Sequence, residues 1–503
     1  MKRHLSAGKS LALLAVLGLG GSLATVPAAA QEPKSPRVEW GRCPDDVAAE
    51  AAPTELRCAT VSVPLDYTHP EGEQIDLTVS RLAAADPDKR RGVLMLNPGG
   101  PGGSGLALSA LLVARGLPSS VTDRYDLIGM DTRGIGHSGR FSCGFTQDSP
   151  YYSNIPPYAV DDAAVTAQAK IAEQTAEQCA ANDHDGRLRH LTTANTARDL
   201  DRIRAALGEE KTSYLGYSYG TALGAAYASM FPERADRIVL DSNIGDTHLD
   251  RDGIRRYALG TEQTLPDFAK WAARRHDSYG LGRTPEQVRT SYLTIAGELD
   301  KAPVAGIDGS LFRLLTFGHL FKQTQYPQLA QTWQAILEGD ETALRGLSAA
   351  RQETPPGAPS PNDNALTVFL AVTCNDVEWP EDVRTYRRGV AEDRERYPLF
   401  GAATANITPC AFWPYAPAEP PVEIDAEGPR NVLLLQNRRD ASTPHRGGKM
   451  LREKFGDRAR LVSVDDSGHG VYVLGDNSCA LNTTTRYLVD GEMPARDTSC
   501  RAD

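Results

Sequence analysis

The pentapeptide Gly216-Tyr217-Ser218-Tyr219-Gly220 places a serine between two glycines, separated from each by one tyrosine. Residues 212–215 before it are a short β-prone run, and residues 221–230 after it favour a helix. A strand that turns abruptly into a helix here would strain the backbone of Ser218 and expose its hydroxyl group. A Cβ atom in place of either glycine would clash where strand and helix pass closely. The pattern predicts a nucleophile; the alternative is a glycine-lined helix start with an inert serine.

A serine nucleophile needs a base, and an acid that orients the base. Asp440 comes soon after the strand-like run 431–436, at the strand end where sheet enzymes place site residues. His469 follows the next such run, 460–464, and the order Ser, Asp, His is that of the α/β-hydrolase fold. Asp440 as a plain turn former and His445 as the base are the competing interpretations. We prefer Asp440 and His469.

The glycine-rich loop Asn97-Pro98-Gly99-Gly100-Pro101-Gly102-Gly103 follows another apolar run, 92–96. Such a loop at the end of a strand lets main-chain N–H groups approach a ligand closely, as an oxyanion hole requires. No Lys-Ser or Lys-Thr pair follows, which disfavours a phosphate loop. We expect the N–H groups of Gly100 and Tyr219 to bind the oxyanion; a mobile surface loop is the alternative.

The elements that must position these residues are predicted by short, unbroken apolar runs. Runs of this kind are typical of parallel strands covered on both faces, and they lie at 92–96, 125–130, 212–215, 237–240, 431–436 and 460–464. Helical patterns lie between them; in residues 193–208, Thr193 is a candidate N-cap and Gly208 follows the last turn. The alternation predicts an α/β-hydrolase fold, with a mostly parallel sheet and helices on both faces.

Residues 246–420 interrupt this alternation with charged helical stretches and Pro-rich breaks. We interpret them as a mainly helical cap inserted between two parts of one core, residues 31–245 and 421–503. The chain without its first 30 residues, about 470 residues, is larger than one typical core, which agrees with an insertion.

Residues 1–30 have the pattern of a secretory signal peptide. Three basic residues precede the apolar stretch 11–19, and the alanines at 28–30 offer a cleavage site. Its removal would change the formal net charge from −11 to −14, because it carries three basic and no acidic groups. We expect a secreted protein, extracellular or associated with the cell envelope, without stable membrane insertion. The acidic balance argues against nucleic acid as a partner.

Eight cysteines in a secreted chain predict disulfides. They occur along the chain as neighbouring couples, which predicts four local pairs: Cys43 with Cys58, Cys143 with Cys179, Cys374 with Cys410, and Cys479 with Cys500. None has the short spacing of a zinc site and the histidines are scattered, so neither a metal nor another cofactor is indicated.

In combination, several motifs resemble the prolyl-aminopeptidase branch of serine hydrolases, and within it the secreted bacterial tripeptidyl aminopeptidases and their mycobacterial cell-envelope relatives. The resemblance spans nearly all of the mature chain. The motifs that carry it are Val61-Ser62-Val63-Pro64-Leu65-Asp66-Tyr67, the 98–103 loop, Asp131-Thr132-Arg133-Gly134-Ile135-Gly136-His137-Ser138, Asp199-Leu200-Asp201, the Ser218 pentapeptide, Asp440-Ala441-Ser442-Thr443-Pro444 and Gly468-His469-Gly470. Pro98 stands where prolyl iminopeptidases carry His, which places the chain nearer the tripeptidyl group.

The resemblance implies release of short peptides, tripeptides being the expected product, from substrates with a free N-terminus. A buried ammonium group must be paired, so acidic residues should line the cap side of the cleft. Asp376 and Glu378 are the candidates, because a disulfide at Cys374 would fix their position. Two solvated surface acids are the alternative.

Other functions remain open from the sequence. An esterase or lipase could use the same triad, since cap residues decide between amide and ester, and a proline-selective aminopeptidase is a further alternative. A noncatalytic binding protein on this scaffold would be expected to lack a triad residue, and all three candidates are present. An epoxide hydrolase or dehalogenase would carry Asp at the position of the nucleophile, and Ser218 excludes these classes.

Overall fold

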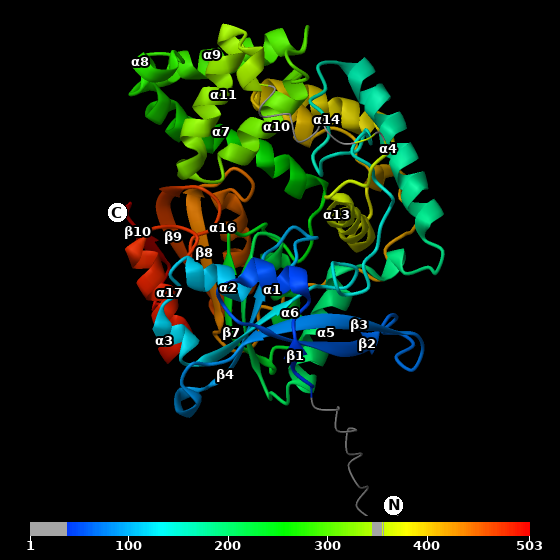
Figure 1. The fold of residues 1–503 in the computed structure, drawn as a ribbon, viewed down its shortest axis with the longest axis vertical. Coiled ribbons are helices and arrows are strands. Elements are labelled where there is room, and N and C mark those ends of the chain that lie inside the picture. The colour runs from blue at the N-terminus through cyan, green and yellow to red at the C-terminus, as the bar shows by residue number, and fades with distance from the viewer. Residues whose placement is uncertain (1–37, 345–354, 356, 503) are drawn as a thin grey trace, which may run out of the picture. The chain divides into compact units, whose positions relative to one another are not determined.

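The computed structural model describes residues 38–344, 355 and 357–502, so the predicted signal peptide at 1–30 lies outside the described residues. Within them, ten strands form one sheet in the order β1-β2-β3-β5-β4-β6-β7-β8-β9-β10 (Figure 1). The strands are β1 Gly41–Arg42, β2 Arg57–Pro64, β3 Gln74–Leu82, β4 Gly92–Asn97, β5 Tyr125–Met130, β6 Thr212–Tyr217, β7 Ala235–Asp241, β8 Val432–Arg439, β9 Ala459–Ser467 and β10 Thr498–Cys500.

The sheet is parallel from β5 through β4 to β10, and β1, β2 and β3 add an antiparallel edge. The six apolar runs of the sequence are β4 to β9, as predicted. Strands β4, β5 and β6 are buried at every position, which explains why their sequences do not alternate. The antiparallel edge was not among the predicted strands, because β2 and β3 alternate in burial along most of their length.

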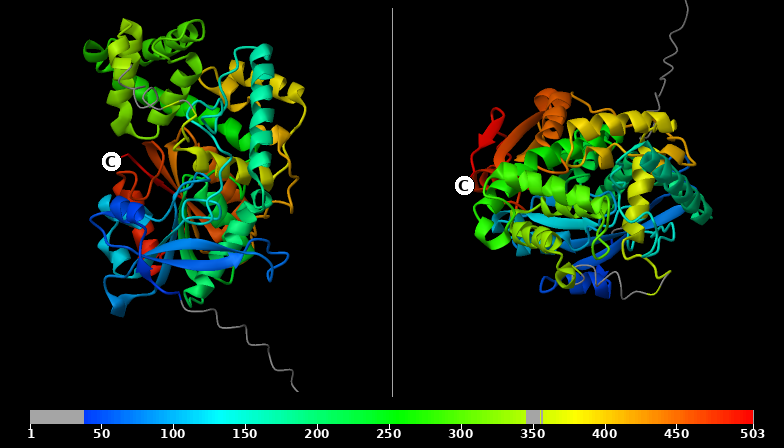
Figure 2. Two further views of the ribbon diagram at one scale, coloured as in Figure 1. Left: turned by 45° about the vertical axis from the view of Figure 1, so that its right-hand side comes forward. Right: turned by 90° about the horizontal axis from the view of Figure 1, so that it is seen from above.

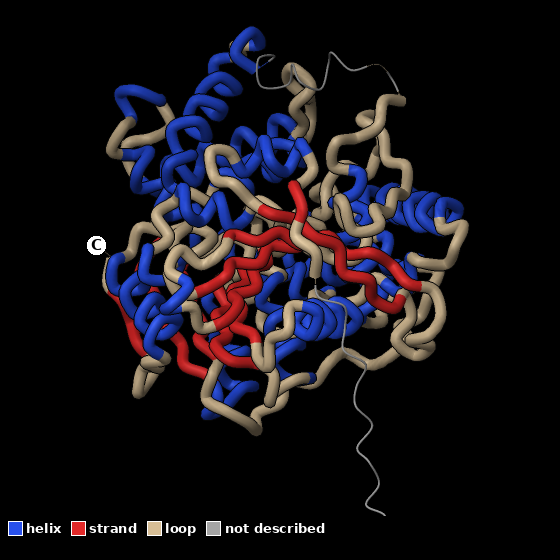
Figure 3. The backbone as a smooth tube through the Cα atoms, turned by 60° about the horizontal axis from the view of Figure 1, so that its bottom comes forward, coloured by secondary structure: helices blue, strands red, loops and turns tan. Residues whose placement is uncertain are grey.

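Successive residues of one strand face different helical layers. In β4, Val93 and Met95 belong to the apolar cluster that includes the helices at 193–206 and 220–230. Leu94 and Leu96 belong to the cluster that includes the helices at 108–114 and 478–490. Figure 3 shows the strands running through the middle with helices on both sides. The core helices are α1 Asp45–Ala51, α2 Leu108–Ala114, α3 Ser119–Thr122, α5 Thr193–Ala206, α6 Gly220–Met230, α16 His445–Phe455 and α17 Ser478–Asp490, with short 3₁₀ turns η1 Pro87–Lys89, η2 Leu188–His190 and η5 Gly456–Arg458.

The N-cap of α5 is Thr192, whose side chain accepts the N–H of Asn195, and the expected cap Thr193 is the first helical residue. The assignment was one residue off because both positions carry a threonine. Gly208 follows the end of this helix at a φ of +75°, as expected.

Between β7 and β8 the chain is mainly helical, and these helices lie over one end of the sheet (Figures 1 and 2). They are α7 Arg251–Ala273, α8 His276–Tyr279, α9 Pro285–Leu299, α10 Gly309–His319, η3 Gln323–Gln325, α11 Tyr326–Glu338, α13 Asp363–Asp376, α14 Val383–Arg396, α15 Gly401–Thr404 and η4 Pro409–Phe412. We call this set the cap helices. Among the described helices, none is long and apolar enough to cross a membrane.

Helix α4, Asp162–Asn182, comes from an earlier part of the chain but packs against the cap helices. Val165 and Ala169 of α4 share an apolar cluster with Tyr386 and Val390 of α14. The structure therefore adds a segment before residue 246 to the helical layer, and the expected boundaries at 245 and 421 stay predictions.

The four expected disulfides are present. Cys43–Cys58 ties the segment before α1 to β2, and Cys143–Cys179 ties the chain after β5 to α4. Cys374–Cys410 joins α13 to η4, and Cys479–Cys500 joins α17 to β10. Each pair fastens one element to a neighbour, and such a cross-link stabilises the fold mainly by restricting the unfolded chain.

The folded protein should contain no thiol that reacts with an alkylating reagent, because all eight cysteines are paired. Mass spectrometry after alkylation without reductant measures this count, and a peptide map identifies the four local cross-links. Alkylated cysteines, or a cross-link between distant parts of the chain, would contradict the pairing.

Candidate active site

Ser218 lies in the turn between β6 and α6, and it is one of few described residues other than glycine with a positive φ, +57°. Its N–H donates to the main-chain oxygen of Asp241 at the end of β7 (2.9 Å). A Cβ atom at Gly216 would lie 2.4 Å from the oxygen of Gly220, so the turn closes only with glycine there. This is the strained strand–turn–helix expected from the pentapeptide.

The glycine-rich loop after β4 lies directly against this turn. A Cβ atom at Gly99 would be 2.4 Å from the oxygen of Tyr217 and 2.9 Å from Cβ of Ser218. Asn97 fixes the loop by accepting the Gly99 N–H (2.9 Å) on its side chain. Among the described residues, no acceptor is assigned to the N–H of Gly100 or of Tyr219, which precedes the first residue of α6. Both donors are therefore available to a ligand oxygen.

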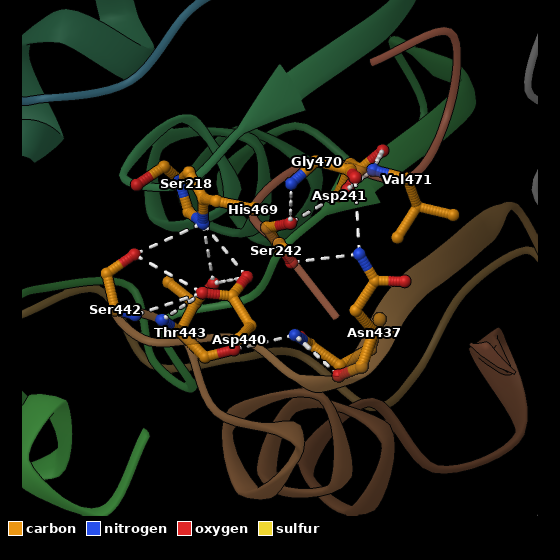
Figure 4. A network of polar contacts seen from close by, with 12 residues as sticks. Ser218, Asp241, Ser242, Asn437, Asp440, Ser442, Thr443, His469, Gly470 and Val471 are labelled. Carbon is orange, nitrogen blue, oxygen red and sulfur yellow. Dashed lines mark hydrogen bonds and ion pairs between the residues drawn. The ribbon is translucent and has the colours of Figure 1, made fainter. Parts of the chain in front are cut away.

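Asp440 directly follows β8 and is fully buried. Its Oδ1 accepts the N–H groups of Ser442 (3.0 Å) and Thr443 (2.9 Å), and its Oδ2 accepts the hydroxyl of Thr443 (2.6 Å). Oδ2 also lies 2.9 Å from Nδ1 of His469 (Figure 4). A proton on Nδ1 satisfies the carboxylate and leaves Nε2 able to accept the proton of a serine hydroxyl.

His469 is held from both the core and the cap. Its main-chain N–H donates to the main-chain oxygen of Phe321 (2.8 Å), which lies just after α10. The centroids of the imidazole and the Phe321 ring are 5.0 Å apart. Burial disfavours the charged imidazolium, but the carboxylate of Asp440 outweighs this and raises the pKa of His469. Figure 4 draws Ser218 next to this imidazole. No pattern in the sequence predicts the Phe321 contact, whereas Thr443 lies in the motif Asp440-Ala441-Ser442-Thr443-Pro444.

The rival base His445 is the first residue of α16. Its Nε2 lies 2.7 Å from the hydroxyl of Ser463 in β9, and no contact with Asp440 is assigned to it. Burial lowers the pKa of its imidazole. The structure thus brings His469, and not His445, to Asp440.

Asp376 and Glu378 are not brought together. Asp376 ends α13 and is buried, and its two oxygens accept the N–H (2.8 Å) and the hydroxyl (2.6 Å) of Thr193. The same hydroxyl is 2.6 Å from the phenol oxygen of Tyr219. Burial raises the pKa of Asp376 to about 7, and the cavity beside it, about 10 Å³, is near the minimum for one water molecule. Glu378 is exposed.

Comparisons with known proteins identify the family of this chain. The family model described as TAP-like protein matches residues 397–500, a range that contains Asp440 and His469. A tripeptidyl aminopeptidase of Streptomyces coelicolor is 35% identical over 474 residues, which cover 92% of this chain and 86% of the relative. The chain belongs to the tripeptidyl aminopeptidase family of α/β-hydrolases.

Two more distant relatives carry different names. Serine protease Hip1 of Mycobacterium tuberculosis is 28% identical, over 92% of this chain and 91% of its own. Carboxylesterase B of the same organism is 29% identical, over 94% of this chain and 92% of its own. The relatives that match this chain over most of its length therefore include proteins named as peptidases and a protein named as an esterase.

His469→Ala should lower kcat by about 10³-fold or more, because the nucleophile loses the group that accepts its proton. His445→Ala is the matched control and should retain most of the activity, since its partner is Ser463. Steady-state kinetics on a short peptide, with thermal melts to confirm folding, measures both. An inactive His445 variant beside an active His469 variant would reverse the choice of base.

Activity should fall as the pH drops through the raised pKa of His469, because only the neutral imidazole accepts a proton. The acid limb of kcat/KM is therefore expected above the usual histidine value of about 6.5. Asp440→Asn should move this limb to lower pH by removing the charge that favours the imidazolium. A limb well below the usual value in the unmodified enzyme would rule out His469 as this titrating base.

Proposed function

We propose that this protein is a secreted serine exopeptidase that releases short peptides, tripeptides being the expected product, from free N-termini. The observation that carries the proposal is the 35% identity to a tripeptidyl aminopeptidase along nearly the whole chain. The hydrogen-bonded Asp440–His469 pair, which Figure 4 draws beside Ser218, supports it. The four disulfides support an oxidising destination, as does the leader-like sequence at 1–30.

In the proposed mechanism, Ser218 attacks the scissile carbonyl carbon while Nε2 of His469 takes the hydroxyl proton. The carbonyl oxygen becomes an oxyanion, which the N–H groups of Gly100 and Tyr219 bind at the positive end of α6. His469 then gives the proton to the leaving amine, and an acyl-enzyme remains on Ser218. Water, deprotonated by the same imidazole, releases the peptide, while Asp440 keeps the ring oriented throughout.

Contacts of the cap helices with the site loops support exopeptidase rather than endopeptidase action. A Cβ atom at Gly260 of α7 would lie 2.5 Å from the main-chain oxygen of Asp440, and one at Gly102 would lie 2.5 Å from that of Ala365 in α13. Phe321 adds the contact to His469. Cap elements thus reach three of the loops that form the site, and we propose that they block longer chains ahead of the scissile bond.

An esterase is the second candidate function, because a relative named carboxylesterase B covers the chain to the same extent. A proline-selective aminopeptidase would use the same triad and would prefer proline as the residue before the cleaved bond. Comparing kcat/KM for peptides and for p-nitrophenyl esters separates the first alternative, and a proline series separates the second.

N-acetylation of a tripeptide substrate should reduce kcat/KM by about 10²-fold or more, because it removes the cation that a closed pocket must pair. Matched free and acetylated fluorogenic tripeptides measure this, with Ser218→Ala as the blank that defines background hydrolysis. Equal turnover of the two substrates would contradict exopeptidase action and favour the esterase or an endopeptidase.

The same substrates test Asp376 and Glu378 as the proposed amine ligands. If Asp376 binds the ammonium, Asp376→Asn lowers turnover of free peptides and leaves acetylated ones unchanged. If Asp376 serves only to hold Tyr219 through Thr193, both substrates lose turnover equally. Glu378→Gln, at an exposed position nearby, is the matched variant and tests the second ligand by the same criterion.

A further inference from the structure

A second buried carboxylate lies behind the base. Asp241 ends β7 and is fully buried, and no described Lys or Arg forms an ion pair with it. Its oxygens accept the N–H of Val471 (3.0 and 3.1 Å), the N–H of Tyr472 (2.7 Å) and the hydroxyl of Ser242 (3.0 Å). Val471 and Tyr472 follow His469 by two and three residues, so this carboxylate holds the loop that carries the imidazole (Figure 4).

The neighbouring residues complete this attachment. Ser242, at a φ of +62°, accepts the N–H of Gly470 (2.9 Å) on its hydroxyl oxygen. Asn437 in β8 donates to the main-chain oxygens of Gly468 (2.9 Å) and Gly470 (3.3 Å). The main-chain oxygen of Asp241 in turn accepts the N–H of Ser218. Asp241 therefore contacts both the turn that carries Ser218 and the loop that carries His469.

We propose that Asp241 is a positioning residue that sets His469 against Ser218 and that its negative charge supports the imidazolium formed during acylation. The inference rests on the proposed serine hydrolysis, but not on which substrate is cleaved. Asp440 contacts the imidazole directly, whereas Asp241 acts through the loop and through its charge.

Charged groups of both the core and the cap act on the imidazole of His469. Asp440 and Asp241 both favour the imidazolium of His469, and Lys322 on the cap side opposes it. Burial raises the pKa of Asp241 to about 7, while the N–H groups it accepts and His469 act in the other direction. The phenols of Tyr217 and Tyr472 are further titratable groups of this region, and the hydroxyl of Tyr217 donates to the main-chain oxygen of Tyr472 (2.8 Å). Removing the charge of Asp241 should therefore lower the pKa of His469.

Asp241→Asn keeps the shape of the side chain but removes its negative charge. It also replaces one of the two acceptor oxygens with an NH₂ group, which cannot accept a main-chain N–H. Ser242→Ala removes one hydroxyl and leaves the charge in place. Asp236→Asn is the matched control, since Asp236 lies at the other end of β7 and pairs with Arg91. The measurement is the rate of Ser218 modification by a phosphonylating reagent between pH 5 and 9, which requires the nucleophile and base but no peptide.

The Asp241 variant should react about 10- to 100-fold more slowly, with its acid limb moved to lower pH by about 0.5 unit or more. Ser242→Ala should react more slowly with an unmoved limb, and Asp236→Asn should match the unmodified enzyme. An unmoved limb in Asp241→Asn overturns the electrostatic role, and an unchanged rate in Ser242→Ala overturns the positioning role, even if Asp241→Asn does not fold. Failure of the unmodified enzyme to be labelled at Ser218 would instead refute the proposed function.

Discussion

The chain passes from β6 into α6 within two residues, and the steric demands of this turn determine the rest of the site. Ser218 is held at a positive φ, and the main chain around it is so close that side chains at 216 and 99 have no space. The 98–103 loop can then lie directly against the serine. The acid and the base only need to arrive at the same edge of the sheet, which a parallel sheet provides at every strand end.

Much of the fold could be predicted because buried parallel strands leave a clear pattern. β4 to β9 are unbroken apolar runs, and the triad candidates follow the carboxyl ends of three of them. The antiparallel edge was not predicted because β2 and β3 mix polar and apolar residues, and α4 carries no sign in its sequence that it packs on α14. Such pairings depend on tertiary contacts between distant segments.

The candidate site shows the same division. The nucleophile, the acid and the base come from short motifs, in which local geometry and chemistry are read together. Asp376 and Glu378 were chosen for their charge beside a cystine, but spacing does not reveal which way a side chain turns at the end of a helix. In the folded chain Asp376 turns inward to Thr193, and Glu378 turns to solvent. Contacts made through the main chain, such as that of Phe321 with His469, leave no trace in side-chain identity.

The hydrogen bond from His469 to the oxygen of Phe321 has a consequence for how substrates enter. This oxygen belongs to the connection between α10 and α11, so the loop that carries His469 is bonded to the cap as well as to the sheet. If that connection moved away to admit a peptide, the loop that carries the imidazole would lose this hydrogen bond until the connection returned. Movement of this connection and the order of the base would then be linked.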